Sequence, residues 1–328
     1  MVDLIYKCPI CAAQPAVAEY KNVFDDRYGY PGKFEILRCQ NCNHRFCTPQ
    51  LASGQIAEVY SYYGRRATNS ASVKEAAQKS TKVSKFSRYL RGVNNQGQNF
   101  APPESILLDV GSGDCSNLLE AKLLGHDSVG FDVDEETNRI ARDLSLEVKI
   151  GQSALDVYGD RTFSWIQLNQ VIEHLLEPEQ ELRKLSTLLL EEGRIFIATP
   201  NVNSVYRFLF QKRWLNWHTP YHQHHFSRNS LSRLLDKAGL EVTNWHSVTP
   251  VVWIQVQLAM LFKPGSPGTP SPVWKDNSVS TSKVKRNRSS AILLAVWIVF
   301  SPIVTLVARA LDAMGLGDCQ VAIVKRKT

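Results

Sequence analysis

Four of the seven cysteines stand in two closely spaced pairs near the start of the chain. Cys8-Pro-Ile-Cys11 and Cys39-Gln-Asn-Cys42 are separated by 27 residues, and each pair can present two thiolates from one tight turn. Zn²⁺ accepts four thiolates without a redox change, and its bonds can fold a segment too small for its own core. The spacing therefore predicts a structural zinc in a zinc ribbon, bound by Cys8, Cys11, Cys39 and Cys42. A redox dithiol is disfavoured because no βαβ pattern surrounds the pairs, while His44 and Cys47 remain alternative ligands.

A loop with two glycines follows an apolar strand at 106–110 and opens a helix. Gly111 and Gly113 let the backbone turn sharply and approach a ligand, which the N–H groups of the helix N-terminus then face. Asp132 ends the next strand, 21 residues after Gly111, where a carboxylate can accept hydrogen bonds from both hydroxyls of a ribose. A nucleotide-type cofactor is predicted here. A dehydrogenase is disfavoured because the third glycine of the dinucleotide fingerprint is missing.

Strands and helices alternate along the middle of the chain. Strands are predicted at 106–110, 128–133, 146–150, 163–168 and 194–199, and helices near 115–125, 135–144 and 179–190. This alternation is typical of a parallel sheet covered by helices on both faces. Before it, 70–91 predicts one helix and 92–105 a linker rich in Gly, Asn and Pro. After it come a helix at 230–238, a strand near 240–248 and an edge strand at 319–325.

Four motifs in this region resemble those of the class I S-adenosylmethionine-dependent methyltransferases. LDVGSGDC is similar to their first motif, GFD to their acidic second motif, FSWIQLNQVIEHLLEP to their fourth strand with the segment after it, and LLLEEGRIFIATPN to their fifth. The resemblance covers about residues 104–248 and implies an α/β fold with a Rossmann-like seven-stranded sheet. Cys115 stands where the family usually has Gly, at the start of a helix.

The ribbon and this resemblance together predict the division of the chain. We expect a zinc ribbon at 1–60, a helical linker at 61–103, the methyltransferase core at 104–248, an apolar and basic helical insertion at 249–317, and the final strand of the core at 318–328.

The resemblance also implies which residues contact S-adenosyl-L-methionine. Those bordering its methionine moiety would be Asp109, Gly111 and Gly113, while Asp132 would hold the ribose hydroxyls. Gln152 or Ser153 would lie near the adenine, and Asn169 and Gln170 would line the side where the methyl group is transferred. For the lining residues other than Asp132, packing remains the alternative to contact.

Histidine can deprotonate a hydroxyl near neutral pH, and histidines cluster in the sequence HTPYHQHHF at 218–226. His174 belongs to a Glu-His pair of the family, and His225 best matches a histidine that relatives place before a late helix. The predicted catalytic candidates are therefore His174, His222 and His225. The alternatives are that His174 packs under the sheet edge and that the cluster lies on the surface.

The segment after the fourth strand also resembles the ubiquinone-biosynthesis O-methyltransferases. In those enzymes a Glu three residues before the Glu-His pair helps to bind a divalent metal. Gln170 stands at that position here, which weakens a metal site at Glu173 and His174 without excluding it. A zinc site built from the clustered histidines is disfavoured because no spaced acid or cysteine accompanies them.

A zinc ribbon joined to this methyltransferase type resembles enzymes that methylate small metabolites. The predicted function is therefore O- or C-methylation of a sugar, quinone or polyketide-like acceptor. An RNA methyltransferase that uses the ribbon to bind RNA is the alternative. It is disfavoured because the fourth strand ends in Asn-Gln-Val-Ile, without the Asn/Asp-Pro-Pro-aromatic clamp of base-amino methyltransferases. A non-catalytic cofactor-binding module is the third class, and a nucleic-acid partner is not expected.

The net charge of +7 is carried by residues 251–328, which hold ten basic and three acidic residues. Lys283, Lys285, Arg286 and Arg288 precede an apolar run of 18 residues at 291–308 that contains Pro302. Because such clusters attract anionic headgroups, 283–308 is predicted to make a peripheral membrane contact, to cover the active site as a lid, or to pack on the core. The start of the chain lacks the apolar core of an export signal, which predicts a cytoplasmic protein.

Overall fold

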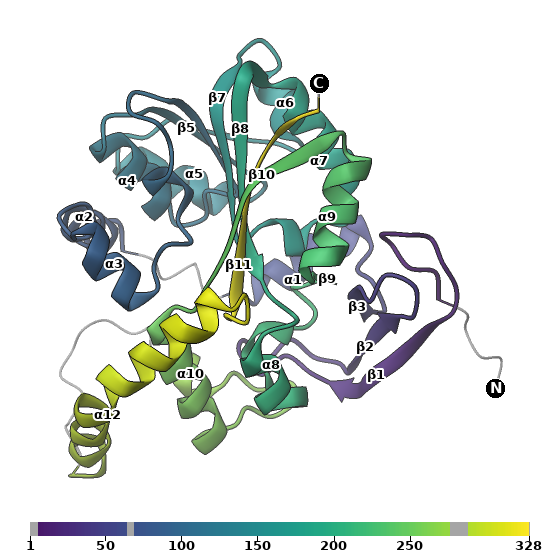
Figure 1. Cartoon of the computed structure of the whole chain (residues 1–328), viewed down its shortest axis with the longest axis vertical. Helices are drawn as coiled ribbons and strands as arrows, with labels where there is room; N and C mark the ends of the chain where they lie inside the picture. The colour runs from purple at the N-terminus through teal and green to yellow at the C-terminus, as the bar shows by residue number, and fades with distance from the viewer. Residues whose placement is uncertain (1–5, 64–68, 276–287, 328) are drawn as a thin grey trace.

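The computed structural model describes residues 6–63, 69–275 and 288–327. A seven-stranded sheet lies at its centre, in the order β10-β11-β8-β7-β4-β5-β6 (Figure 1). Five of these strands are parallel: β4 (Ile106–Val110), β5 (Asp127–Asp132), β6 (Val148–Ile150), β7 (Phe163–Asn169) and β8 (Leu189–Pro200). The predicted α/β fold with a Rossmann-like seven-stranded sheet is confirmed.

The last strand of the chain lies inside the sheet. β11 (Cys319–Arg326) pairs antiparallel with β8 on one side and with β10 (Leu240–Val248) on the other. The prediction of a parallel sheet for the alternating strands is confirmed, whereas the prediction that 319–325 forms an edge strand is wrong. The first four side chains of β11 are buried, whereas most of those on β10 are partly or fully exposed. The more apolar strand takes the interior position, where both of its faces are covered.

Helices cover both faces of the sheet (Figure 1). One side carries α2 (Ser70–Thr81), α4 (Ser116–Leu123) and α5 (Glu135–Asp143), and the other carries α7 (Pro178–Thr187) and α9 (Arg228–Lys237). A short helix, α6 (Ala154–Tyr158), follows β6. The single helix predicted at 70–91 is two helices, because the Ser84 hydroxyl accepts a hydrogen bond from the N–H of Ser87 and starts α3 (Lys85–Arg91).

A second sheet holds the N-terminal segment against the core. Its strand order is β1 (Ala16–Val23), β2 (Phe34–Cys39), β3 (Arg45–Thr48) and β9 (His224–His225). β9 comes from the histidine-rich segment and pairs antiparallel with β3, with Phe46 opposite His224. Cys8, Cys39 and Cys42 belong to the same buried cluster as the inner side chains of α9. The predicted boundary near residue 60 therefore separates segments that share one sheet, and the domain division stays a prediction.

Three of the remaining helices lie at one end of the molecule: α8 (Val205–Phe210), α10 (Val251–Phe262) and α12 (Arg288–Ala313) (Figure 1). The other two are α1 (Ile56–Ser61), nearer the middle of the molecule, and α11 (Pro272–Lys275). α12 contains the apolar run, whereas Lys283, Lys285 and Arg286 lie outside the described residues. Arg309 pairs with Asp312 at 2.8 Å and donates to the carbonyl of Thr249, which fixes the end of α12 to the core. Within the described segments, no helix combines the length and apolar character needed to cross a membrane.

Candidate functional site

The loop after β4 has a backbone shape that glycine adopts most easily. Gly111 and Gly113 have φ angles of 71° and 55°, in the left-handed region. A Cβ on Gly111 would lie 2.6 Å from Val171 Cγ2, so a side chain there would collide with the segment after β7. Cys115 also has a positive φ, 63°, just before α4. That conformation costs a non-glycine residue about 1–2 kcal/mol, which gives a physical reason for the Gly usual at this position in the family.

Asp132 links the glycine loop after β4 to the turn after β5 through hydrogen bonds at the carboxyl edge of the sheet. One oxygen of its buried carboxylate accepts a hydrogen bond from the N–H of Gly113 at 2.7 Å. The other oxygen accepts from the N–H groups of Val133 and Asp134, at 2.7 and 3.0 Å. Because a carboxylate offers about four acceptor positions, it can also accept from a ligand hydroxyl.

Asp109 and Asn169 lie at the carboxyl ends of the neighbouring strands β4 and β7 and carry polar atoms suited to a ligand. Asp109 Oδ1 accepts from Gln167 Nε2 at 2.9 Å, and Asn169 Oδ1 accepts from the N–H of Gly97 at 3.0 Å. Their other polar atoms, Asp109 Oδ2 and Asn169 Nδ2, are buried without a hydrogen-bond partner among the described residues. Burial raises the pKa of Asp109 to about 7, although its hydrogen bond from Gln167 lowers it. An unsatisfied acceptor and an unsatisfied donor thus lie beside the glycine loop.

The other predicted cofactor residues, Gln152, Ser153 and Gln170, are exposed or hydrogen-bonded to other side chains. Gln152 and Ser153 follow β6 at the same edge, but Gln152 is exposed and the Ser153 hydroxyl donates to Glu181 Oε1 at 3.2 Å. Gln170 has a φ of 58° and donates from Nε2 to Cys319 Sγ at 3.3 Å, toward β11. The structure therefore brings the two glycines together with Asp109, Asp132 and Asn169, while their contact with a cofactor stays a prediction.

The raised pKa of Asp109 predicts how the stability of the cofactor-free protein depends on pH. The folded protein holds this proton up to about pH 7, whereas the unfolded chain loses it near 3.8. The free energy of unfolding should therefore fall as pH rises through this window, by up to about 4 kcal/mol. Urea unfolding at several pH values should show a weaker pH dependence in Asp109→Asn. Equal pH dependence in both proteins would contradict the assignment.

A buried acid lies among the histidines. Glu173, in the 3-10 turn η4 (Ile172–His174) after β7, accepts from Thr199 Oγ1 at 2.9 Å through Oε2. Its Oε1 lies 4.0 Å from His222 Nε2. The ligating atoms of Glu173, His174 and His222 all lie within 4.8 Å of one another. The expectation that no acid accompanies the histidines is therefore wrong: Glu173 is 49 residues from His222 in sequence, and only folding joins them.

Hydrogen bonds and burial set the state of these groups. His222 Nδ1 donates to the carbonyl of Asn216 at 2.9 Å, so its Nε2 carries the lone pair. Burial lowers the pKa of His222 well below its usual value, which keeps the ring neutral. Burial also raises the pKa of Glu173 to about 8. His174 is partly exposed, and its Nδ1 lies 3.3 Å from the Tyr60 hydroxyl.

The remaining histidines extend this cluster or support it. His218 lies 4.8 Å from His222 between ring centroids and stacks on Tyr221. His225 packs edge-on against Trp217, and neither of its buried ring nitrogens has a hydrogen-bond partner among the described residues. His44 contacts His224 through Nε2 at 3.1 Å, so the alternative of His44 as a cysteine-site ligand is not supported. The clustered histidines are buried, contrary to the surface alternative.

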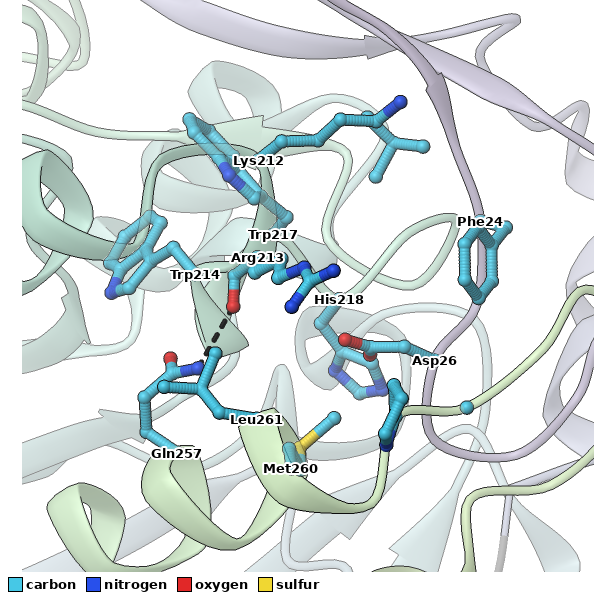
Figure 2. Close-up of a pocket in the computed structure, with 13 residues that line it drawn as sticks. Phe24, Asp26, Lys212, Arg213, Trp214, Trp217, His218, Gln257, Met260 and Leu261 are labelled. Carbon is cyan, nitrogen blue, oxygen red and sulfur yellow. Dashed lines mark hydrogen bonds between the residues drawn. The ribbon is translucent and has the colours of Figure 1, made fainter.

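A cavity of about 330 Å³ opens next to His218 (Figure 2). Its walls come from the end of β1, from the turns η5 (Gln211–Arg213) and η6 (Leu215–Trp217), and from α10. The Asp26 and Arg213 side chains point into it near the ring of His218. Burial raises the pKa of Asp26 to about 7, partly opposed by the charge of Arg27. Sequence reasoning missed Asp26 and Arg213, because neither lies in a motif; the paired acids in FDDR were the one available signal.

The four predicted cysteine ligands come together in the N-terminal sheet. Cys8 Sγ lies 3.6 Å from Cys42 Sγ, and Cys11 Sγ lies 3.5 Å from Cys39 Sγ. All four sulfur atoms lie within 4.8 Å of one another. A tetrahedral ion with Zn–S bonds of about 2.3 Å would hold its sulfurs about 3.8 Å apart. The thiol set therefore fits a tetrahedral metal ion. Cys47 is buried in a different cluster and does not join it.

Comparison with known protein families decides the class of the chain. A family model described as a methyltransferase domain matches residues 80–244, half of the chain. The chain belongs to this methyltransferase family. It is an S-adenosylmethionine-dependent methyltransferase, as its motifs predicted, and S-adenosylmethionine is the cofactor that the family implies. No curated protein matches the methyltransferase.

Solved structures similar to this methyltransferase are distant from it in sequence. A possible histamine N-methyltransferase from Thermotoga maritima is 16% identical, with a TM-score of 0.42, covering 73% of this chain and 89% of its own. The 1,6-didemethyltoxoflavin-N1-methyltransferase of Burkholderia thailandensis is 15% identical, with a TM-score of 0.41 and coverage of 66% and 89%. A Haloferax volcanii complex of the Trm112 activator with a putative methyltransferase gives 11% identity, a TM-score of 0.46 and coverage of 83% and 97%.

The polar atoms at the sheet edge fit the cofactor of the family. Asp109 Oδ2 can accept from the ammonium group of the methionine moiety, and Asn169 Nδ2 can donate to its carboxylate. Gly111 and Gly113 keep the loop between these atoms in the left-handed conformation that glycine adopts most easily.

Removal of the Asp132 carboxylate should weaken cofactor binding. Two charge-assisted hydrogen bonds to ribose hydroxyls would be lost, so Asp132→Ala should weaken the free energy of S-adenosylmethionine binding by about 1.5–3 kcal/mol. The Kd should therefore rise roughly 10- to 150-fold. Isothermal calorimetry measures this directly. Asp132→Asn keeps the shape but loses the charge and one of the two accepting oxygens, so it should show a smaller loss than Asp132→Ala. Exposed Glu135→Ala is the matched control. Unchanged affinity in Asp132→Ala would rule out the assignment.

Proposed function

We propose that the enzyme transfers the methyl group of S-adenosylmethionine to an oxygen or carbon of a small-molecule acceptor bound beside His218. The observation that carries this proposal is the line of rings from the cavity to the cofactor edge. His218 contacts His222 with ring centroids 4.8 Å apart, and His222 contacts His174 at 4.7 Å. His174 in turn comes five residues after Asn169, the last residue of β7.

We assign the role of general base to His174. In the reaction, the acceptor atom attacks the methyl carbon in line with the bond from carbon to the sulfonium sulfur. The new bond to the acceptor forms as that bond breaks, its electron pair stays on sulfur, and the acceptor proton passes to the imidazole. His222 and His225 would border the acceptor. The raised pKa of Glu173 favours its neutral form, with Oε1 4.0 Å from His222 Nε2.

A divalent cation is the second candidate for activating the acceptor, because Glu173, His174 and His222 supply one carboxylate and two imidazoles within 4.8 Å. When bound, such an ion would lower the pKa of an acceptor hydroxyl. Calorimetric titration with Mn²⁺ or Zn²⁺ tests whether this site binds metal. It uses the parent enzyme and its Glu173→Gln variant, both with the four-cysteine site already filled with zinc. Binding that is absent, or equal in both proteins, excludes the metal and leaves His174 as the base.

The cavity supports a small acceptor over RNA. Its volume of about 330 Å³ is at the lower end for small-molecule sites, and tryptophan side chains form part of its wall. The first 250 residues carry no net charge, which gives little attraction to a phosphate backbone.

Incubation with methyl-labelled cofactor tests the proposed function. Label should pass to organic-soluble or small water-soluble metabolites of a cell extract and not to total RNA from the same cells. Transfer to RNA would favour the ribbon as an RNA-binding module, and cofactor binding without transfer to either fraction would favour the non-catalytic class.

A further inference from the structure

Three helices at one end of the molecule expose an unusual number of apolar side chains. We call this the α8–α10–α12 surface, made by the exposed residues Phe208, Leu209, Val252, Leu258, Phe262, Ile303, Leu306, Val307 and Met314. Phe262 is 80% exposed, Phe208 67% and Leu306 66%. Single exposed apolar residues are normal, but a group of eight on three neighbouring helices, with Met314 directly after α12, marks an interaction surface.

α10 presents apolar side chains on two opposite faces. Ile254, Gln257 and Met260 are buried against the core. Val252, Leu258 and Phe262 are exposed and, at about 100° per residue, lie within an arc of about 120° on the side of α10 away from the buried residues. A helix packed only on its own core would place polar residues there.

Hydrogen bonds hold the three helices together as one surface. Gln257 of α10 accepts from the N–H of Leu215 at 2.6 Å and donates to the carbonyl of Arg213 at 2.9 Å, which ties α10 to the turns after α8. The N–H of Val205, at the start of α8, donates at 3.1 Å to the carbonyl of Leu316, just beyond α12. Figure 1 shows the three helices at the same end of the molecule.

The charged residues in the segments around α8 and α10 are all basic. Residues 205–213 and 251–275 contain five basic residues and no acidic residue. Of these, Lys212, Arg213 and Lys263 are exposed beside the apolar side chains. Positive charge interleaved with large apolar side chains is the composition that an anionic lipid surface attracts.

We propose that the α8–α10–α12 surface docks on an anionic lipid bilayer. Its aromatic and aliphatic side chains enter the boundary between headgroups and acyl chains, and its lysine and arginine side chains meet anionic headgroups. The cavity of Figure 2 has exposed Lys212, Arg213 and Pro264 at its rim, on this same surface. If the cavity holds the acceptor, as proposed above, the acceptor is an amphiphile that the enzyme reaches from the membrane surface.

Vesicle flotation tests the docking surface. The full-length, zinc-loaded protein should float with vesicles of phosphatidylcholine and phosphatidylglycerol, and only weakly with phosphatidylcholine alone. Lys212→Gln/Lys263→Gln should lower the partition coefficient about 30-fold, since each cation near the surface contributes about fivefold. Phe208→Ser/Phe262→Ser should lower it about tenfold. The controls Leu190→Ser, at the start of β8, and Lys122→Gln/Arg142→Gln, on α4 and α5, should bind like the parent.

Three results would overturn this proposal. They are absence of flotation with anionic vesicles, equal flotation with neutral ones, and losses in the control variants as large as those in the surface variants. A concentration-dependent dimer that Phe208→Ser/Phe262→Ser abolishes, seen by sedimentation without lipid, would instead assign the surface to a second copy of the chain. None of these readouts uses methyl transfer, so they are independent of the proposed reaction.

Discussion

Replacement of Cys39 and Cys42 by Ser is expected to remove one zinc ion per chain and to unfold the N-terminal sheet. The four sulfur atoms already lie at the spacing of a tetrahedral site. Binding of structural zinc by small thiolate sites is worth on the order of 10 kcal/mol, more than a sheet of short strands can supply from its own core. Metal analysis of the purified protein and of the Cys39→Ser/Cys42→Ser variant measures the loss.

The consequences of zinc loss should be confined to the acceptor side of the enzyme. β3 pairs with β9, so unfolding of the sheet removes the partner of His224 and His225. Asp109 and Asp132 lie on β4 and β5 and have no contact with that sheet among the hydrogen bonds described for them. We therefore expect acceptor turnover to fall while the Kd for S-adenosylmethionine changes less than about threefold.

Cys47→Ala is the matched control, because Cys47 is buried in the same sheet but lies outside the four-sulfur group. It should retain one zinc ion. An iron centre, a disulfide between the cysteines, or full zinc content in the Cys39→Ser/Cys42→Ser variant would each contradict a structural zinc site.

The parallel part of the fold could be predicted because its signals are local. β4, β5 and β7 are short, largely apolar runs that precede helical patterns, and Gly111 and Asp132 stand at strand ends that neighbouring residues define. The same reasoning located the cysteine site, since two short motifs carry all of its ligands. What these features share is that a window of a few residues contains the whole signal.

The position of β11 and the origin of β9 could not be read in this way. β11 is sequence-distant from both of its neighbours, and only the pairing of Cys319 with Pro200 and with Val248 shows that it enters the middle of the sheet. β9 is two residues long, too short for a period of two to be recognised. Both outcomes depend on tertiary packing.

Local sequence patterns also failed to show that Glu173 lies beside the clustered histidines. Glu173 is visible in the Glu-His pair, yet its partner His222 arrives from a loop beyond β8. A scan for spaced ligands along the chain cannot join them, because the distance that matters is 4.0 Å through space. Asp26 and Arg213 at the cavity were missed for the same reason.

His174→Ala is expected to lower kcat by about 10²- to 10⁴-fold while leaving the Kd for S-adenosylmethionine nearly unchanged. The magnitude is that of a general base removed from a proton transfer in the transition state. His174 is the partly exposed member of the group that includes buried Glu173 and His222, so it can meet an acceptor proton without a rearrangement of the core. Its contact with the Tyr60 hydroxyl at 3.3 Å holds the ring in place.

The pH profile separates a base from a packing residue. If His174 is the base, kcat/KM of the parent enzyme should fall at acidic pH as the imidazole becomes protonated, and residual activity in His174→Ala should lack that limb. Tyr60→Phe removes the hydroxyl that contacts His174 and leaves the imidazole in place, so it should lower kcat much less than His174→Ala and retain the acidic limb. A His174→Ala enzyme with near-parental kcat, or with the same acidic limb, would mean that His174 packs beneath the sheet edge, and would move the search for the base to His222 and His225.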